Sequence, residues 1–282
     1  MSVPRRWRDH ALLVAATVTD GATLRVATWN LWWRHGDWEA RQPAILECLR
    51  DLDADIVALQ EASSREPDQL EWLHAELGYH VVASPQGVDD RYGVVNGLLS
   101  RWPIISSRWE YLDVGDMPPH RTVLQAIIES PSGALPVVCT HLSHGFDKSE
   151  LRTRQLRQIA ALVAEMRLEP DVLPPLLLGD LNAVPEADEI RMLTGRGAAA
   201  VDGLVFSDVW EHAGSGPGAT YAAANPHVTD SAWPERRLDY IMVGWPRPRP
   251  WGNPVDVRLF GTEPSGGVVA SDHYGVVAEL RS

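Results

Sequence analysis

The segment Leu176-Leu177-Leu178-Gly179-Asp180-Leu181-Asn182 carries the strongest structural signal in this sequence. Its three leucines predict a short strand that is buried on both faces, and Gly179 ends the apolar run. Asp180 and Asn182 follow two positions apart, just past the expected end of the strand. A carboxylate and an amide in that place suit the binding of a polar ligand, although an Asx-rich turn would give the same pattern.

Strands and helices can be predicted on both sides of this segment. Further strands are expected at 24–30, 56–59, 79–83, 94–100, 104–112, 123–129, 136–140, 237–243, 255–260 and 275–280. Helices are expected at 41–51, 67–77, 148–168 and 186–193, with a shorter helical piece within 198–210. Residues 213–234, rich in Gly, Ala and Pro, predict a long loop around one short strand at Thr220-Tyr221. The loop lengths indicate mostly antiparallel strands, so the pattern favours two sheets packed face to face with helices outside.

Length and composition are those of one globular domain with a sizeable core. The 282 residues are 45% hydrophobic and 22% charged, without an internal repeat or a low-complexity linker. We expect a domain over 24–282, preceded by an N-terminal extension over 1–23. The net charge of −13 argues against broad, nonspecific adhesion to nucleic acid or to an anionic membrane, because both attract basic surfaces.

Cysteine usage and the N-terminus indicate the cellular compartment. Cys48 and Cys139 lie among apolar neighbours and predict buried thiols in a reducing environment rather than a disulfide. Arginines near the N-terminus precede a short apolar run at 11–18, which resembles a secretory signal, but Asp9 and His10 interrupt that pattern. Because no apolar run approaches the length of a membrane span, a soluble cytoplasmic protein is expected.

Polar side chains recur where the predicted strands end, in places where strand formation does not require them. They are Asn30, Glu61, His141, the pair Asp180 and Asn182, and Asp272 with His273, while Asp239 lies within a further strand. Singly, each has a structural explanation: a turn former, a carboxylate at a helix start or a buried core histidine. Together, several hard oxygen ligands and two imidazoles are typical of a divalent-cation site that hydrolyses a phosphate ester.

The order of these motifs resembles one known family. They are Thr28-Trp29-Asn30-Leu31, Leu59-Gln60-Glu61, Asn96-Gly97-Leu98-Leu99-Ser100, Thr140-His141-Leu142, Gly179-Asp180-Leu181-Asn182, Arg237-Leu238-Asp239-Tyr240-Ile241 and Ser271-Asp272-His273. This chain is similar to the endonuclease/exonuclease/phosphatase superfamily, whose fold is that of deoxyribonuclease I. The resemblance covers about residues 24–280, and the seven motifs in order are far more specific than any one of them.

The resemblance implies a four-layer α/β sandwich, with two mixed or antiparallel sheets packed together and flanked by helices. It also implies a Mg²⁺ or Mn²⁺ cofactor and in-line attack of water on phosphorus. Carried over to this sequence, Glu61 becomes the principal metal ligand. Asn30 and Asp272 complete or support the metal shell.

The resemblance also implies the catalytic groups. Asp180 orients and deprotonates the attacking water, and Asn182 hydrogen-bonds the phosphoryl oxygens or the nucleophile. His273 contacts the phosphate and is held in its orientation by Asp239. His141 takes a position that is His in the nuclease and sphingomyelinase-like branches and Tyr in the abasic-site repair branch.

Two residues are assigned to substrate binding. Asn96 lies in one of the matched motifs, and Arg121 precedes a strand that should end at the same edge as the other site residues. An arginine there could donate two hydrogen bonds to a phosphate, or it could be an ordinary surface residue.

The tryptophans of 29–38 could line a pocket, although packing against the first helix is favoured. The glycine-rich loop at 214–218 lacks the following Lys of a P-loop and predicts a flexible turn.

The sequence therefore predicts a Mg²⁺-dependent phosphoesterase, either a phosphodiesterase or a phosphatase, that acts on a small or medium phosphate ester. A nuclease of the same fold is the first alternative, because the fold does not select the substrate. The acidic balance and the lack of a basic arm favour a substrate other than nucleic acid. A binding protein that kept the fold and lost the chemistry is disfavoured, because every catalytic position is filled.

Overall fold

The computed structural model describes residues 22–88, 92–167, 173–228, 235–247 and 249–282. The N-terminal extension expected over 1–23, including its signal-like segment, therefore lies almost wholly outside the described residues. Residue 168, the last of the helix expected at 148–168, and residues 229–234, the end of the loop expected at 213–234, also lie outside the described residues.

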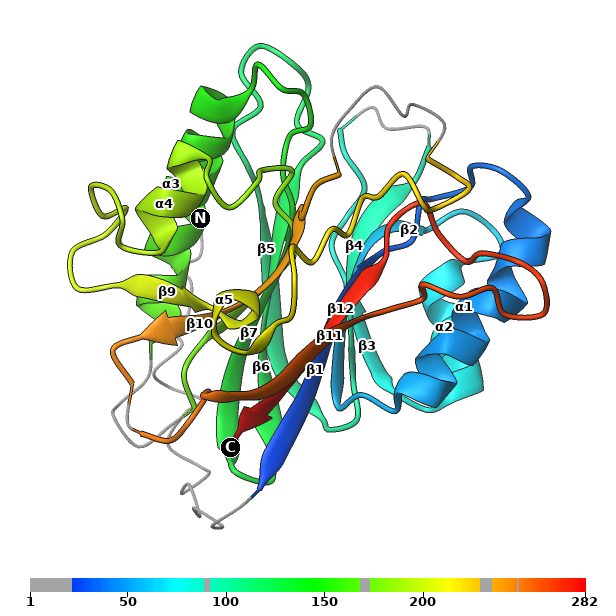
Figure 1. Ribbon diagram of the computed structural model, residues 1–282, viewed down its shortest axis with the longest axis horizontal. Helices are drawn as coiled ribbons and strands as arrows, with labels where there is room; N and C mark the ends of the chain where they lie inside the picture. Colours follow the sequence, from blue (N-terminus) through cyan, green and yellow to red (C-terminus); the bar gives the residue numbers. More distant parts are fainter. Residues whose placement is uncertain (1–21, 89–91, 168–172, 229–234, 248) are drawn as a thin grey trace, which may run out of the picture.

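Two six-stranded mixed sheets form the centre of the molecule (Figure 1). The first has the order β11-β12-β1-β2-β4-β3, and its strands are Pro254–Phe260, Gly275–Arg281, Thr23–Asn30, Ile56–Ser63, Val94–Ser100 and His80–Ala83. The second has the order β5-β6-β7-β8-β10-β9, and its strands are Ile104–Tyr111, Thr122–Ser130, Gly133–His141, Leu176–Asp180, Asp239–Trp245 and Val205–Asp208. Only β1 with β2 and β7 with β8 pair in parallel within these sheets.

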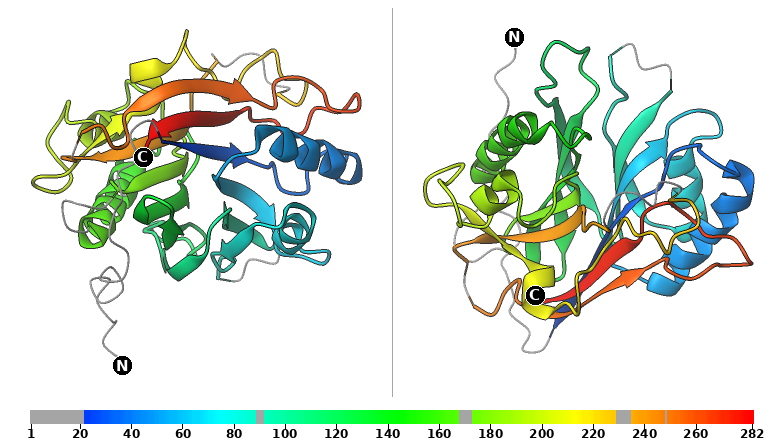
Figure 2. Two further views of the ribbon diagram at one scale, coloured as in Figure 1. Left: turned by 90° about the horizontal axis from the view of Figure 1, so that it is seen from below. Right: turned by 45° about the horizontal axis from the view of Figure 1, so that its top comes forward.

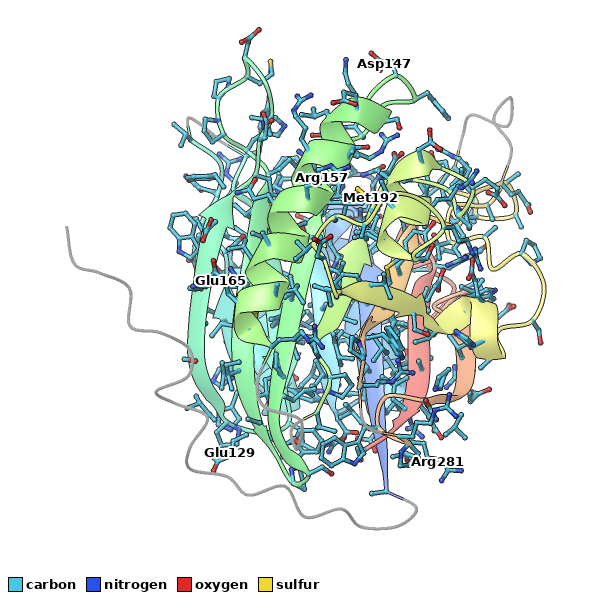
Figure 3. All side chains as sticks on the ribbon, turned by 90° about the vertical axis from the view of Figure 1, so that its left-hand side faces the viewer. Glu129, Asp147, Arg157, Glu165, Met192 and Arg281 are labelled. Carbon is cyan, nitrogen blue, oxygen red and sulfur yellow. The ribbon has the colours of Figure 1, made fainter. Side chains whose placement is uncertain are left out.

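Helices cover the outer faces of both sheets, which gives the four layers that were expected (Figures 1 and 2). The helices are α1 (Trp38–Leu52), α2 (Gln69–Leu77), α3 (Ser149–Met166), α4 (Asp188–Leu193) and α5 (Val209–Ala213). The first two lie on one sheet, and α3 and α4 lie on the other. Figure 3 looks onto this second helical layer, with Arg157 and Glu165 on α3 and Met192 on α4.

Three apolar cores lie between the four layers, and strand alternation assigns side chains to them. In β8, Leu176 and Leu178 belong to the core between the two sheets, whereas Leu177 belongs to the core under α3 and α4. In β1, Val26 faces the other sheet and Trp29 faces α1, where its ring packs edge-on against Phe260 at 5.1 Å. Because side chains alternate along a strand, the leucine run buries both faces of β8, as predicted.

Two local predictions differ from the structure. The helical piece expected within 198–210 begins only at the last two residues of that range, as α5, and Val205–Asp208 before it pairs with β10 as the edge strand β9. The carboxylate of Asp208 caps that helix by accepting from the Trp210 amide at 3.0 Å. The strand expected at Thr220-Tyr221 is reduced to a single bridge between Tyr221 and Arg236.

The remaining predictions about the chain concern its cysteines and the membrane. Both cysteines are free thiols; Cys139 is buried, as predicted, whereas Cys48 is only half-buried. In the part of the chain that the structure describes, every helix is too short or too polar to cross a membrane.

Candidate active site

One cross-strand row of polar side chains marks the edge at which β1, β7 and β8 end and β10 begins, at the top of Figure 1. We call this the site edge. In the sheet register, His141 of β7 and Asp239 of β10 both lie opposite Asp180 of β8. The amide of Asn30, at the end of β1, donates to Asp180 Oδ2 across the two sheets at 3.1 Å. Three residues that are far apart in sequence therefore meet at Asp180.

Gly179 is required for this convergence, because β8 and β7 approach closely just below the site edge. The residue has φ +151°, and an added Cβ would lie 2.0 Å from the carbonyl oxygen of Thr140. No side chain can be accommodated at that distance without moving a strand. The glycine that the sequence showed as the end of an apolar run thus sets the position of Asp180.

The Asp180 carboxylate is buried and held in a fixed orientation. Its Oδ1 accepts from the backbone amide of Asn182 at 2.9 Å, and its Oδ2 accepts from Asn30. Burial, and next the negative charge of Asp239, raise the pKa of Asp180 to about 7, against the opposing charge of His273. A carboxyl group with such a pKa can accept a proton near neutral pH.

His273 is paired with Asp239 through its inner ring nitrogen. The Nδ1 atom lies 2.8 Å from Asp239 Oδ2, and Nε2 lies 4.0 Å from Asp180 Oδ2. Burial alone would lower the pKa of His273, but the charge and hydrogen bond of Asp239, with Asp180 and Asp272, raise it well above the usual value. His273 is therefore cationic at neutral pH and presents a charged donor at the site edge.

The backbone around His273 is tied to the end of β1. The indole of Trp29 donates to the carbonyl of His273 at 2.9 Å, and the Ser271 hydroxyl donates to the carbonyl of Asn30 at 2.7 Å. The Ser-Asp-His motif is thus anchored by its serine, while its other two side chains are left for the site.

His141 lies between two carboxylates at the site edge and does not point away into the core. Its Nε2 is 3.4 Å from Asp180 Oδ2 and its Nδ1 is 3.9 Å from Glu61 Oε1. Burial, and next the positive charge of Arg121, lower the pKa of His141 well below the usual value. The imidazole is therefore neutral at pH 7, and the site holds one charged and one neutral histidine.

The three residues predicted to hold a metal lie on the first sheet and its loops. Glu61 has φ +52° at a register shift between β2 and β4, a β-bulge that redirects its side chain. Asn30 Oδ1 accepts from the backbone amide of Trp32 at 2.9 Å.

Burial, and more weakly the charges of Glu61 and Asp239, raise the pKa of Asp272 to about 6, although His273 opposes them. The raised pKa means that the ionised form of Asp272 is unfavourable where it lies. A cation beside Glu61 and Asp272 would stabilise that ionised form, so the oxygen donors of these residues fit a hard divalent ion.

A second group could also hold an ion. Asp180, Asp239 and His273 each offer one ligand atom, and these atoms lie within 4.8 Å of one another. The Oδ1 of Asp239 is buried without a hydrogen-bond partner in the described residues. A possible metal-binding site therefore exists at the site edge.

Arg41 of α1 fixes the loop that follows Asn30 at the end of β1 and the loop before β12 that contains Asp272. Its buried guanidinium donates to the carbonyl oxygens of Leu31, Trp32, Trp33 and His35 after β1, and of Ala270 before β12. Burial lowers the pKa of Arg41 to about 10, and the charges of Asp272 and Glu61 oppose this shift. Because five backbone acceptors share one rigid donor group, Asn30 and Asp272 are held in a fixed relation.

The remaining predicted site residues differ in their contacts. Asn182 has φ +50°, and its amide donates to the carbonyl of Leu142 at 3.1 Å. Arg121 contacts His144 Nδ1 at 3.2 Å, and its Nε atom is buried without a hydrogen-bond partner in the described residues. Asn96 donates to both oxygens of Thr122 at 3.0 and 3.1 Å, so the structure joins it to β6 rather than to the other site residues.

Several residues near the site were not found from the sequence. Arg236, Tyr221 and Phe146 form a row of contacts that ends at His273. Arg236 directly precedes a recognised motif, and its proximity in sequence to Asp239 was the one available signal. Nothing in the sequence connects Phe146 with Arg236, because ninety positions separate them.

Comparisons with known proteins agree with this architecture. The endonuclease/exonuclease/phosphatase family matches residues 27–273. Among curated proteins no sequence matches this chain.

Solved structures are similar at low sequence identity. TDP2 from D. rerio, complexed with single strand DNA product, has 23% identity and a TM-score of 0.75, covering 93% of this chain and 100% of that one. TDP2 from Caenorhabditis elegans has 20% identity and a TM-score of 0.73, covering 93% and 99%. A protein of the same family from Bacteroides vulgatus has 20% identity and a TM-score of 0.72, covering 92% and 98%. These similarities establish the fold.

Proposed function

This chain belongs to the endonuclease/exonuclease/phosphatase family, and we propose that it is a divalent-metal-dependent hydrolase of phosphate esters. The observation that carries the proposal is the row His141–Asp180–Asp239, with a neutral imidazole on one side of Asp180 and the Asp239–His273 pair on the other. We further propose that the substrate is a small or medium organic phosphate, either a diester or a monoester.

The cofactor would be Mg²⁺ or Mn²⁺, held by Glu61 and Asp272 with the oxygen of Asn30. When bound, such an ion polarises a phosphoryl oxygen and lowers the barrier to attack at phosphorus. Arg41 supports the positions of Asn30 and Asp272, because it holds the backbone at Leu31 and Ala270 beside them. The hard oxygen donors of these three residues support this assignment.

The protein's own groups would perform the remaining work of an in-line displacement. Asp180, fixed by Asn30 and Asn182, orients a water molecule and accepts its proton as the oxygen bonds to phosphorus. His273 donates to the phosphoryl oxygens, on which negative charge accumulates in the transition state, and Asp239 keeps that imidazole oriented and charged. The leaving ester oxygen departs with the electron pair of its bond to phosphorus and takes a proton from solvent, and Asp180 later returns its own proton to solvent.

A nuclease remains the second candidate function, because the D. rerio TDP2 structure contains a single-strand DNA product. The net charge of −13 favours a smaller substrate. Activity with Mg²⁺ against bis-p-nitrophenyl phosphate, p-nitrophenyl phosphate and supercoiled plasmid tests the proposal. We expect hydrolysis of at least one nitrophenyl ester and no plasmid nicking. Plasmid cleavage that outpaces both esters would favour the nuclease.

Duplex DNA is expected to bind weakly, because the chain carries excess negative charge and nonspecific binding depends on phosphate neutralisation by basic side chains. Fluorescence anisotropy of a labelled random duplex should show little binding at micromolar protein and physiological salt, with a shallow salt dependence. A submicromolar dissociation constant would contradict this expectation.

The two histidines should affect turnover much more than folding. His273→Ala and His141→Ala are each expected to lower kcat on the order of 10²-fold or more, since each acts on charge that develops in the transition state. Asp239→Asn should lower kcat less than His273→Ala, because an amide can still accept from Nδ1. The exposed His212 of α5 provides a control, and His212→Ala should leave kcat unchanged. An unaltered kcat in His141→Ala would remove that residue from the catalytic set.

A further inference from the structure

A pocket of about 530 Å³ lies between the end of β10 and the start of β11. Strand β10 begins with Asp239 at the site edge and ends with Trp245, so the pocket lies at the opposite end of that strand (Figure 1). The residues that line it include Trp245, Arg247, Arg249 and Asn253. A volume of this size is typical of a site for a small ligand.

The pocket is cationic, although the chain as a whole is acidic. Among the described residues, its lining has two arginines and no aspartate or glutamate, whereas the chain has 38 acidic residues against 25 lysines and arginines. Arginines elsewhere, such as Arg152 and Arg196, each pair with a carboxylate at 2.7 Å. In the part of the chain that the structure describes, neither Arg247 nor Arg249 has such a partner. The two charges are therefore available to a ligand.

The guanidinium of Arg247 is held in one orientation by its own loop. Its Nε atom donates to the carbonyl of Trp251 at 2.6 Å, and one terminal amino group donates to Asn253 Oδ1 at 3.1 Å. The turn itself is tied to β12, because the Gly252 amide donates to the carbonyl of Arg281 at 2.7 Å. A half-buried charge that is already fixed loses little further freedom when an anion binds to it.

Arg247 and Arg249 affect each other as like charges. Burial, and next the positive charge of Arg249, lower the pKa of Arg247. Two neighbouring guanidinium groups without a carboxylate repel each other. An anion between them would remove this repulsion and would accept charged hydrogen bonds from both, and the planar donor groups of arginine match the oxygens of a phosphate.

We propose that this pocket binds a free phosphate anion that carries more than one negative charge, held by Arg247 and Arg249 with the ring of Trp245 as one wall. A multiply charged anion compensates both arginines, whereas a monoanion leaves one of the two charges unmatched. The excess negative charge of the chain favours a soluble anion over an anionic membrane as the source of the phosphate. The pocket is separate from the site edge, and the inference does not depend on the proposed function.

Calorimetric titration with pyrophosphate in the presence of EDTA tests the pocket without any readout of turnover. We expect saturable binding that persists in His273→Ala, a background that removes one cation of the site edge, where phosphate could also bind. In that background, Arg247→Gln and Arg249→Gln should each weaken pyrophosphate binding by about five- to ten-fold, the size of one charged hydrogen bond at a partly exposed position. Both substitutions together should abolish it.

Arg258→Gln is the matched control for these variants. Arg258 is exposed on β11 but lines a different pocket, beside Glu47 of α1, so its loss should leave the affinity for pyrophosphate unchanged. Because Arg249 is exposed, its variant keeps the test decisive even if loss of the Arg247 contacts disturbs the loop. Trp245 is 54% exposed and gives a second readout: pyrophosphate should change the tryptophan emission, and Trp245→Phe should lose that change.

Three results would overturn the inference. The first is equal pyrophosphate affinity in His273→Ala with and without the two arginine substitutions, and the second is a lack of binding in His273→Ala itself. The third is binding to phosphatidylcholine vesicles that contain phosphatidic acid, without any binding of free pyrophosphate. Acetate at the same ionic strength should not displace pyrophosphate, and displacement by acetate would contradict the preference for a multiply charged anion.

Discussion

Asp180→Asn is expected to lower kcat by about 10³- to 10⁴-fold, the upper range for loss of a general base. The amide nearly preserves the volume of the side chain but cannot accept the proton of the attacking water. Folding should be little affected, because the substitution removes a buried carboxylate whose ionisation is already opposed by burial and by Asp239. Steady-state kinetics on the best nitrophenyl ester, together with thermal unfolding, measure both effects.

The control for this variant is a second buried carboxylate that lies outside the site. Asp208 accepts from Arg237 at 2.7 Å and, like Asp180, has a pKa raised by burial. Asp208→Asn should lower the unfolding temperature through loss of this buried ion pair and leave kcat of the folded protein within a few-fold. If Asp180→Asn kept more than a tenth of the wild-type kcat, Asp180 could not be the base.

Removal of divalent ions is expected to abolish hydrolysis, and Mg²⁺ or Mn²⁺ should restore it. Glu61→Gln should raise the Mg²⁺ concentration for half-maximal activity by about 10-fold or more, because a neutral amide is a weaker ligand than a carboxylate. The wild type should also show a higher unfolding temperature with Mg²⁺, since an ion that binds only the folded state stabilises it by mass action. This second measurement does not depend on turnover.

A surface carboxylate provides the comparison for the metal experiment. Glu76 of α2 pairs with Arg50 at 2.7 Å on the protein surface, and Glu76→Gln should leave the Mg²⁺ requirement unchanged. Full activity after exhaustive chelation would show that the reaction needs no metal. A Mg²⁺ shift in unfolding temperature that is equal in wild type and Glu61→Gln would place the ion elsewhere.

Local sequence patterns were sufficient for most of the fold. Strand β8 is buried on both faces because Leu176, Leu177 and Leu178 are consecutive apolar residues between a proline pair and a glycine, and such a run has no polar face to expose. The helices end close to the predicted residues because their signals are local, such as Asp68 capping α2 and Gly78 ending it in a left-handed conformation. The edge strand β9 was missed because Val205–Asp208 is too short to show a period, and its pairing with β10 is a tertiary contact.

The sequence motifs, through the family resemblance that they carry, predicted that polar residues would meet at one edge, and the sheet register brings His141 and Asp239 to Asp180. Asn96 instead joins β6. The sequence showed Gly179 only as the end of the apolar run, and the reason that no side chain fits there, a 2.0 Å approach to the Thr140 carbonyl oxygen, is visible only in three dimensions. Only the three-dimensional structure shows that Arg41 fixes the loops after β1 and before β12, and that the Arg236 guanidinium contacts both Phe146 and Tyr221. Such contacts depend on where long, irregular loops pack against each other, and no periodicity or spacing along the chain records that position.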